Sequence, residues 1–310
     1  MKKFLINFSL FFIPIVLIIL FFEYRLSGIK NLYIEKKELY EKKMPNCEIL
    51  ILGSSHALYG INPVYLEAPA FNMANVSQPL YYDYKILEKY IDRMPNLKVV
   101  ICPISYFTLD MNFFDEKFPE YWRIFYYKRF YNISSLKSPT FDPKNFSYIA
   151  LYGNERSFLW GLKGFNINLI KEMNEFGFME KEEQTINLSD KNGIERVSFH
   201  DSIMSEKGRE ENVRYLANII NILKAKNIQP VLITTPVYKT YSDHVNMDKY
   251  NWIQKTLSDI ARKDNINYLN YFYDKRFIAR DFYNSDHLNS TGAKKMTLVL
   301  QNDLNKFIKK

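Results

Sequence analysis

Cysteine is scarce in this 310-residue sequence, which contains only Cys47 and Cys102. Each belongs to a predicted strand, Cys47 at the start of one and Cys102 at the end of another. In a parallel sheet these positions lie at opposite ends, on the order of 15 Å apart at the rise of a strand. A disulfide needs Cα atoms within about 7 Å of each other. We therefore expect two free, buried thiols.

Motifs that hold nucleotides or metals are missing as well. The sequence has no Walker loop and no Gly-x-Gly-x-x-Gly run. His200 and His244 are isolated, and neither is at metal-ligand spacing. The net charge of +8 arises from lysines scattered among Asp and Glu, without a known nucleic-acid motif. We expect no cofactor, no metal and no nucleic-acid partner, and interpret the charge as solvated surface.

A long hydrophobic run is present at the N-terminus. Residues 4–22 are predominantly apolar, and a bilayer core requires about 20 such residues in a helix. No small-residue cleavage site of a signal peptide follows Phe22. We predict an uncleaved transmembrane anchor over residues 1–25, followed by a charged juxtamembrane spacer over residues 26–46.

Strand and helix patterns alternate in the rest of the chain. Continuous, β-branched apolar runs predict buried strands at Cys47–Gly53, Lys98–Cys102, Val231–Thr235 and Ile266–Tyr271. Apolar residues at helical spacing predict helices over 209–225, 248–263 and 292–308. We interpret residues 208–212 as the solvated first turn of a helix. This alternation predicts an α/β fold with a doubly wound parallel sheet.

Residues 107–200 differ from this pattern. They are rich in aromatic residues, contain Pro119, Pro139 and Pro143, and show no clear strand. We predict a helical and loop insertion over the carboxyl edge of the sheet, within a domain spanning residues 47–310. In doubly wound folds, ligands bind at that edge.

Two polar motifs follow predicted elements of the sheet. Gly53-Ser54-Ser55-His56 comes directly after the first strand, where backbone N–H groups at the start of a helix can stabilise an oxyanion. His287 lies on a polar loop just before the last helix, and histidine is the natural base for a serine. Taken alone, the first motif is explained by a serine N-cap and the second by a surface histidine.

Together, Gly53-Ser54-Ser55 and the loop His287-Leu288-Asn289 with Gly292-Ala293 resemble the SGNH/GDSL hydrolase superfamily. That family has Gly-Asp-Ser in its first block and Asp-x-x-His in its last. The resemblance covers about residues 47–106 and 209–300. It implies a three-layer, flavodoxin-like sheet and an enzyme acting on ester bonds, with Ser55 as nucleophile and His287 as base.

The residue that orients His287 is left open by the motif. Asn284 stands at the position of the family's Asp and can orient an imidazole through its carbonyl, but it cannot stabilise an imidazolium as a charge. Asp286, adjacent to the histidine, and Asp281 are the other candidates. A Ser–His pair assisted by a backbone carbonyl is a further possibility.

The family's oxyanion blocks match this chain only loosely. Ser77 or Gln78 stands where the second block has Gly, and Ile104-Ser105-Tyr106 offers no Gly-x-Asn. The resemblance implies an oxyanion hole made by the Ser55 backbone N–H and a donor from residues 75–78. We expect the oxyanion or substrate-binding residues to be Ser54, His56, Asn75, Ser77, Gln78 and Ser105.

The combination of anchor and altered motifs looks most like membrane-anchored SGNH-like proteins of bacterial surface polymers, such as alginate-acetylation and teichoic acid D-alanyl-transfer proteins. The resemblance implies acyl transfer to or from a glycan hydroxyl through an acyl-Ser55. It implies an acylated glycan substrate, a membrane acyl-donor protein as a partner, and a single-pass location with the domain outside the cytoplasmic membrane. The lysines on both sides of the anchor give conflicting signals about orientation. Alternatives are a non-catalytic binding or scaffold protein on the same fold, and a lipid-directed esterase.

Overall fold

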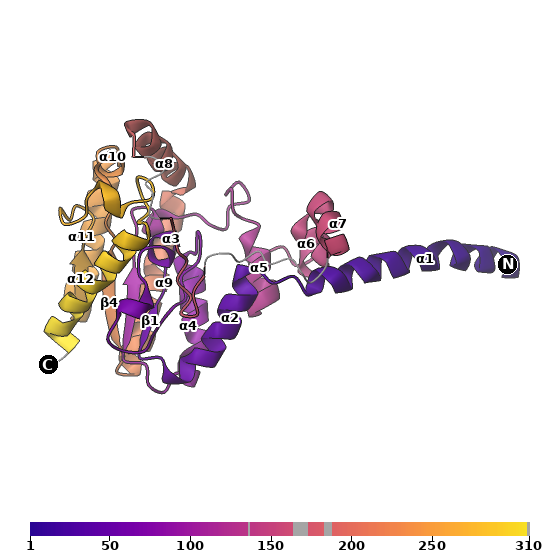
Figure 1. Cartoon of the computed structure of the whole chain (residues 1–310), viewed down its shortest axis with the longest axis horizontal. Coiled ribbons are helices and arrows are strands. Elements are labelled where there is room, and N and C mark those ends of the chain that lie inside the picture. The colour runs from indigo at the N-terminus through magenta and orange to yellow at the C-terminus, as the bar shows by residue number, and fades with distance from the viewer. Residues whose placement is uncertain (136, 164–172, 183–187, 309–310) are drawn as a thin grey trace. The chain divides into compact units, whose positions relative to one another are not determined.

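A computed structural model describes the chain except residues 136, 164–172, 183–187 and 309–310 (Figure 1). The chain divides into two compact units. The first comprises Met1–Lys37 and Trp122–Lys171, and the second Glu38–Tyr121 and Glu172–Lys310. The spacer over residues 26–46 and the insertion over 107–200 stay predictions about domains. Among the described residues of the second range, helices and single bridges occur but no strand.

The first unit is built from helices. Helix α1 (Lys2–Ser27) is long and apolar enough to cross a membrane. At 1.5 Å per residue its 26 residues span about 39 Å. Near its end, the Glu23 carboxylate accepts the backbone N–H of Tyr148, and Arg25 donates to the Gly161 carbonyl. The other helices of this unit are α5 (Arg123–Tyr131), η5 (Pro143–Asn145), α6 (Tyr148–Tyr152) and α7 (Asn154–Lys163). Helix α2 (Leu32–Lys43) begins in this unit and ends in the second.

The second unit contains a five-stranded parallel sheet. Its strands are β1 (Ile49–Ile51), β2 (Ala70–Asn72), β3 (Val99–Pro103), β4 (Gln229–Thr234) and β5 (Asn267–Asn270). The strand order is β2-β1-β3-β4-β5, and every pairing is parallel. This is the flavodoxin-like doubly wound order, so the predicted fold class is confirmed. Strand β2 was not predicted, because a three-residue edge strand leaves little apolar pattern to read.

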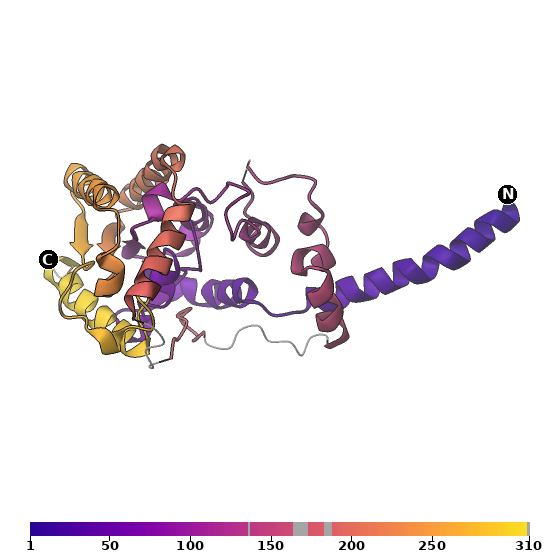
Figure 2. The same cartoon turned by 90° about the horizontal axis from the view of Figure 1, so that it is seen from above.

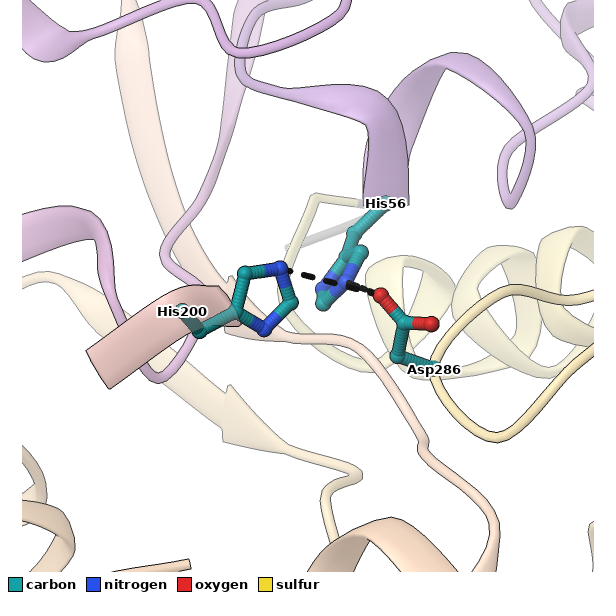
Figure 3. A group of neighbouring side chains, drawn as sticks. All are labelled: His56, His200 and Asp286. Atoms are coloured by element: carbon teal, nitrogen blue, oxygen red, sulfur yellow. Dashed lines mark hydrogen bonds and ion pairs between the residues drawn. The ribbon is translucent and has the colours of Figure 1, made fainter. Parts of the chain in front are cut away.

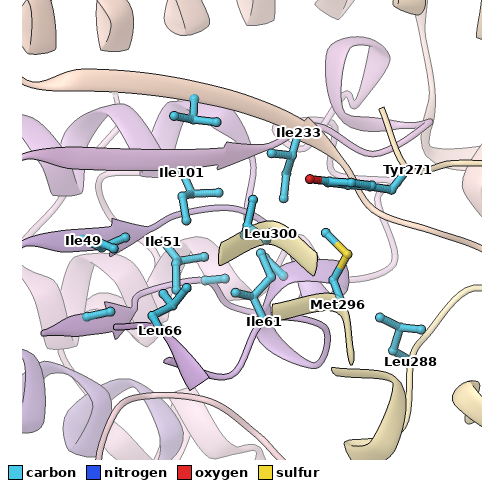
Figure 4. Packing of buried hydrophobic residues seen from close by; sticks show 14 of the residues in the cluster. Ile49, Ile51, Ile61, Leu66, Ile101, Ile233, Tyr271, Leu288, Met296 and Leu300 are labelled. Carbon is cyan, nitrogen blue, oxygen red and sulfur yellow. The ribbon is translucent and has the colours of Figure 1, made fainter. Parts of the chain in front are cut away.

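Helices cover both faces of this sheet (Figures 1 and 2). Ile51, Ile101 and Ile233 project from adjacent strands toward Met296 and Leu300 of α12 (Figure 4). Helix α9 packs on β4 and on α4. The unit's helices are η1 (Met44–Asn46), α3 (Ser55–Leu58), η2 (Pro63–Tyr65), α4 (Leu80–Tyr90), η3 (Ile91–Arg93), η4 (Thr108–Asp110), α8 (Asp190–Ile203), α9 (Glu206–Ala225), α10 (Lys239–Ser242), α11 (Met247–Asp264), η7 (Ala279–Asp281) and α12 (Ser290–Ile308).

The two cysteines are free and buried, as expected. Cys47 precedes β1 and Cys102 lies near the end of β3. Burial raises the pKa of the Cys47 thiol to about 12. Both thiols therefore belong to the interior and carry no reactive thiolate near neutral pH.

The interpretation of residues 208–212 as a solvated first turn is wrong. Arg209 donates through Nε and Nη2 to the two carboxylate oxygens of Asp110, at 2.8 Å each. The guanidinium also lies 3.9 Å from the ring centroid of Trp252. Asn212 is buried and donates to two carbonyls next to Asp110 in the chain. The turn thus ties α9 to the segment after β3.

Candidate active site

The turn after β1 presents Ser55 at the carboxyl edge of the sheet. Gly53 has a φ of +110°, a conformation that side chains rarely adopt, and an added Cβ would lie 3.3 Å from Pro103. Ser54 then precedes α3, whose first residue is Ser55. The backbone N–H of Ser55 therefore has no acceptor within the helix. Because β1 lies between β2 and β3, the turn opens at the point where the strand order reverses, which is where ligands bind in such sheets.

The loop between η7 and α12 brings His287 to this serine. Nε2 of His287 lies 2.9 Å from Oγ of Ser55. On the other side of the ring, Nδ1 lies 3.2 Å from Oδ1 of Asn284 and 3.3 Å from Oδ1 of Asp286. The Asn284 oxygen also accepts the backbone N–H of His287 at 2.8 Å, which fixes the direction of the amide. Both neighbours of Nδ1 are acceptors, so Nδ1 carries the proton and Nε2 offers its lone pair to Ser55.

Asp286 is the carboxylate beside the His287 ring. It is buried, and its carboxylate receives two hydrogen bonds of 2.8 Å from Nε and Nη2 of Arg196. Burial by itself would raise the pKa of Asp286, but His287, His56 and Arg196 hold that pKa well below its usual value. The carboxylate therefore stays ionised next to the imidazole. The loop geometry lets it reach the ring of the adjacent residue.

Two further histidines face the same carboxylate (Figure 3). Nε2 of His56 lies 3.3 Å from Oδ2 of Asp286, and Nε2 of His200 lies 3.8 Å from it. Burial lowers the pKa of both histidines, so both are neutral. Nδ1 of His200 is 2.6 Å from the Tyr241 hydroxyl. The expectation that His200 is isolated is therefore wrong, because folding brings α8 onto the loop of His287.

These three side chains have the chemistry of metal ligands, with one ligand atom of each within 4.8 Å of the others. A cation is already present at this point in the form of Arg196. Its guanidinium occupies both carboxylate oxygens of Asp286, and Nη2 lies 3.5 Å from Nε2 of His200. The carboxylate and the lone pair that a metal would need are thus engaged by the same side chain.

Of the predicted site residues in the loop after β2, Ser77 lines a pocket beside Ser55, whereas Asn75 and Gln78 do not. Ser77 lines the pocket and has a φ of 51°, the left-handed conformation in which glycine is favoured. Gln78 is buried and donates to Asp83, which also accepts the Gly53 N–H. Asn75 is buried and accepts the backbone N–H that follows it. Asn75 and Gln78 thus hydrogen-bond within this part of the chain, and neither lines the pocket.

Ser54, Ser105 and Asp281 are also buried, and none of them lines the pocket beside Ser55. Ser54 is the residue before α3. Ser105 donates its backbone N–H to Thr108, and among the described residues its hydroxyl has no partner. The Asp281 carboxylate binds the Ile278 N–H and Lys295, so it orients the loop and not the His287 ring.

A pocket of about 220 Å³ opens beside Ser55 and His287. Its wall includes the predicted Ser77 and Asn284, and residues that were not predicted: Tyr59, Val76, Phe107, Glu120, Lys181, Arg196, Phe199, His200, Ile203 and Tyr283. One signal for Arg196 was present in the sequence. Arg196 and His200 are four residues apart, which places them on one face of a helix.

Comparison with known proteins gives no matching family model and no matching curated protein. Among solved structures, the chain is similar to a candidate acylhydrolase from Bacteroides fragilis NCTC 9343, with 11% identity, a TM-score of 0.42, and coverage of 86% of this chain and 92% of that one. It is also similar to a candidate platelet activating factor protein from Streptococcus pneumonia, with 10% identity, a TM-score of 0.43, and coverage of 88% and 91%. Neither likeness bears on the chemistry, which rests on the side chains described above.

Proposed function

We propose that this chain is a membrane-anchored serine esterase or O-acyltransferase that works through an acyl-Ser55 intermediate. The observation that carries the proposal is the 2.9 Å hydrogen bond between Oγ of Ser55 and Nε2 of His287. The Nδ1 of the same ring faces an ionised carboxylate. A nucleophile, a base and a group that orients the base are the parts of a serine-hydrolase site.

The chemistry follows from this arrangement. Ser55 Oγ attacks the ester carbonyl while Nε2 of His287 takes its proton, giving a tetrahedral oxyanion and an imidazolium facing Asp286. The oxyanion is stabilised by the Ser55 N–H and a donor near Ser77. His287 then protonates the leaving alcohol as the ester bond breaks. Water or a sugar hydroxyl next attacks acyl-Ser55, with His287 again taking the proton and returning it to Ser55.

The size of the pocket supports a short acyl group. At about 220 Å³ it lies below the roughly 300 to 1,000 Å³ of sites for drug-sized ligands. Its aromatic wall, with Tyr59 and Tyr283, suits a sugar ring as well as an acyl chain. We therefore propose an acylated cell-surface glycan as substrate, with a membrane acyl-donor protein as partner and the domain outside the cytoplasmic membrane. The small volume favours this substrate over a phospholipid.

A non-catalytic binding or scaffold protein on the same fold is the alternative. Its motivation was Asn284 in place of the family's Asp and the missing Gly-x-Asn. Asp286 lies within 3.3 Å of the ring and offers the charge that Asn284 lacks. That contact favours the enzyme.

The test is intact-mass analysis of the full-length protein in detergent after a fluorophosphonate or p-nitrophenyl acetate pulse. We expect a mass gain in the wild type, none in Ser55→Ala, and at least a hundredfold slower gain in His287→Ala, because a general base contributes roughly 10² to 10⁴. Ser202→Ala, which removes an exposed hydroxyl of α8, is the matched control and should label normally. An unlabelled but folded wild type would favour the scaffold protein.

A further inference from the structure

We propose that Arg196 is a positioning residue of the Ser55–His287 pair, whose guanidinium clamps the Asp286 carboxylate against the imidazole and offsets its charge. This inference rests on the proposed function, because it concerns how the same pair is tuned. Arg196 comes from α8, ninety residues before Asp286 in the chain.

The Arg196 guanidinium and the Asp286 carboxylate form a bidentate contact. Nε of Arg196 donates to Oδ1 of Asp286 and Nη2 donates to Oδ2, both at 2.8 Å. Such a two-point contact fixes the plane of the carboxylate, which a single contact does not. Oδ1, held in this way, is also the oxygen 3.3 Å from Nδ1 of His287. The clamp therefore decides which oxygen the imidazole meets.

Four N–H groups from three side chains converge on this one carboxylate, two from Arg196 and one each from His56 and His287. Oδ2 receives Nη2 of Arg196 and the ring nitrogen Nε2 of His56 at 3.3 Å. The second N–H of Nη2 points to Nε2 of His200 at 3.5 Å, and the Tyr241 hydroxyl holds the opposite nitrogen of that ring. His56 and His200 thus support the clamp from two sides. These four side chains carry no net charge together, because the Asp286 carboxylate is balanced by the Arg196 guanidinium and the rings of His56 and His200 are neutral.

The consequence concerns the imidazolium that forms during acyl transfer. Without Arg196, the buried negative charge of Asp286 would attract a proton to His287 in the resting enzyme, and protonated His287 cannot act as a base. Arg196 offsets this attraction while keeping the carboxylate in place. Among the described residues, His56 and Tyr59 of α3 pack on the His287 ring, and the titratable groups that line its pocket also include His200 of α8, Lys181, Glu120 and Tyr283.

The experiment compares Arg196→Gln with the wild type in full-length protein in detergent. We expect the acid limb of the pH profile of Ser55 labelling to move to higher pH by roughly one unit. Labelling at pH 6 should fall several-fold more than labelling at pH 8, because a shift of one unit changes the neutral fraction of His287 by at most tenfold. Added guanidinium ion should restore part of the rate in Arg196→Gly, because the side chain is 26% exposed and lines the pocket.

A matched control is offered by the other bidentate arginine. Arg209 binds buried Asp110 through the same two atoms at the same 2.8 Å, and its side chain is 24% exposed, but it does not line the pocket. Arg209→Gln should lower the melting temperature about as much as Arg196→Gln does. It should not move the acid limb of the pH profile of Ser55 labelling. An unmoved acid limb in Arg196→Gln, or an equal shift in Arg209→Gln, would overturn the proposal.

Two further measurements distinguish a failure of this inference from a failure of the proposed function, and the arginine clamp from a metal site. If wild-type Ser55 does not label, the proposed function fails, and the inference is read instead from the NMR titration of the His287 ring in the wild type and Arg196→Gln. The chain has only four histidines, so the His287 signal is identified by its loss in His287→Gln. Loss of labelling with a chelator, and its return with Zn²⁺, would overturn the clamp because the cation beside Asp286 would then be a metal.

Discussion

At the scale of single residues, the candidate site depends on two acceptors that share one N–H. Asn284 lies 3.2 Å and Asp286 3.3 Å from Nδ1 of His287. The two are not equivalent, because only a carboxylate stabilises the imidazolium that forms when Ser55 loses its proton. Asp286 therefore offers, one residue before the histidine, the negative charge that Asn284 lacks.

This difference predicts unequal losses on substitution. Asp286→Asn should lower the first-order rate of acylation by roughly 10³ to 10⁴, because an amide can turn its N–H toward the ring and favour the wrong tautomer. Asn284→Ala should lower it by about tenfold or less, since Asp286 still accepts from Nδ1. Acylation rates, with melting temperatures as a check on folding, measure this. A larger loss in Asn284→Ala would identify the amide as the true orienter.

At the scale of elements, Asp83 joins α4 to the two loops of the site. Its Oδ1 accepts the N–H of Gly53 at 2.9 Å and the side-chain amide of Gln78 at 2.6 Å. One carboxyl therefore connects the nucleophile turn to the loop that contains Ser77. Burial raises the pKa of Asp83 to about 7, although both hydrogen bonds act in the opposite direction.

The raised pKa predicts a pH-dependent stability. An unfolded Asp has a pKa of 3.8, so the folded protein binds this proton more tightly, and the stability that the proton contributes is lost as pH rises from about 4 to 7. Asp83→Asn should remove this loss, worth roughly 4 kcal/mol for a shift from 3.8 to about 7. Its melting temperature relative to the wild type should therefore rise by several degrees between pH 4 and pH 8.

Thermal unfolding across this pH range measures the effect. Asp92→Asn is the control, because the Asp92 side chain is 80% exposed and pairs with Lys226 at the surface. The wild type and Asp92→Asn should keep the same pH dependence. Parallel curves for the wild type and Asp83→Asn would show that Asp83 titrates normally.

At the scale of the whole molecule, an apolar helix and a compact α/β unit occur in one chain. Helix α1 exposes large apolar side chains along most of its length, including Leu10 and Phe11. In water, so large an apolar surface would favour association, and in a bilayer it is solvated. By length and composition, α1 is therefore suited to cross a membrane.

Membrane attachment through α1 predicts how the protein fractionates. Full-length protein should stay in the membrane pellet after an alkaline carbonate wash. The double change Leu17→Arg and Ile18→Arg should release it, because each arginine costs about 2.5 to 3.5 kcal/mol at the centre of a span. Val64→Arg, at an exposed apolar residue of η2, is the control and should stay in the pellet. Release of the wild type would contradict an anchor.

The sequence by itself determined the elements that local patterns encode. Continuous β-branched runs predicted four of the five strands, and helical spacing predicted α9, α11 and α12. Ser55 and His287 were identified because each belongs to a short motif beside such an element. Periodicity and turn chemistry act over a few residues, so they can be read without the fold.

Only the tertiary structure decided what surrounds those two residues. His56, Arg196 and His200 meet Asp286 across separations of up to 230 residues, and no local pattern encodes such a pairing. Strand β2 owes its existence to β1 beside it. These contacts form because pairing of the strands brings the loops together at one edge of the sheet, so they exist only in the folded chain.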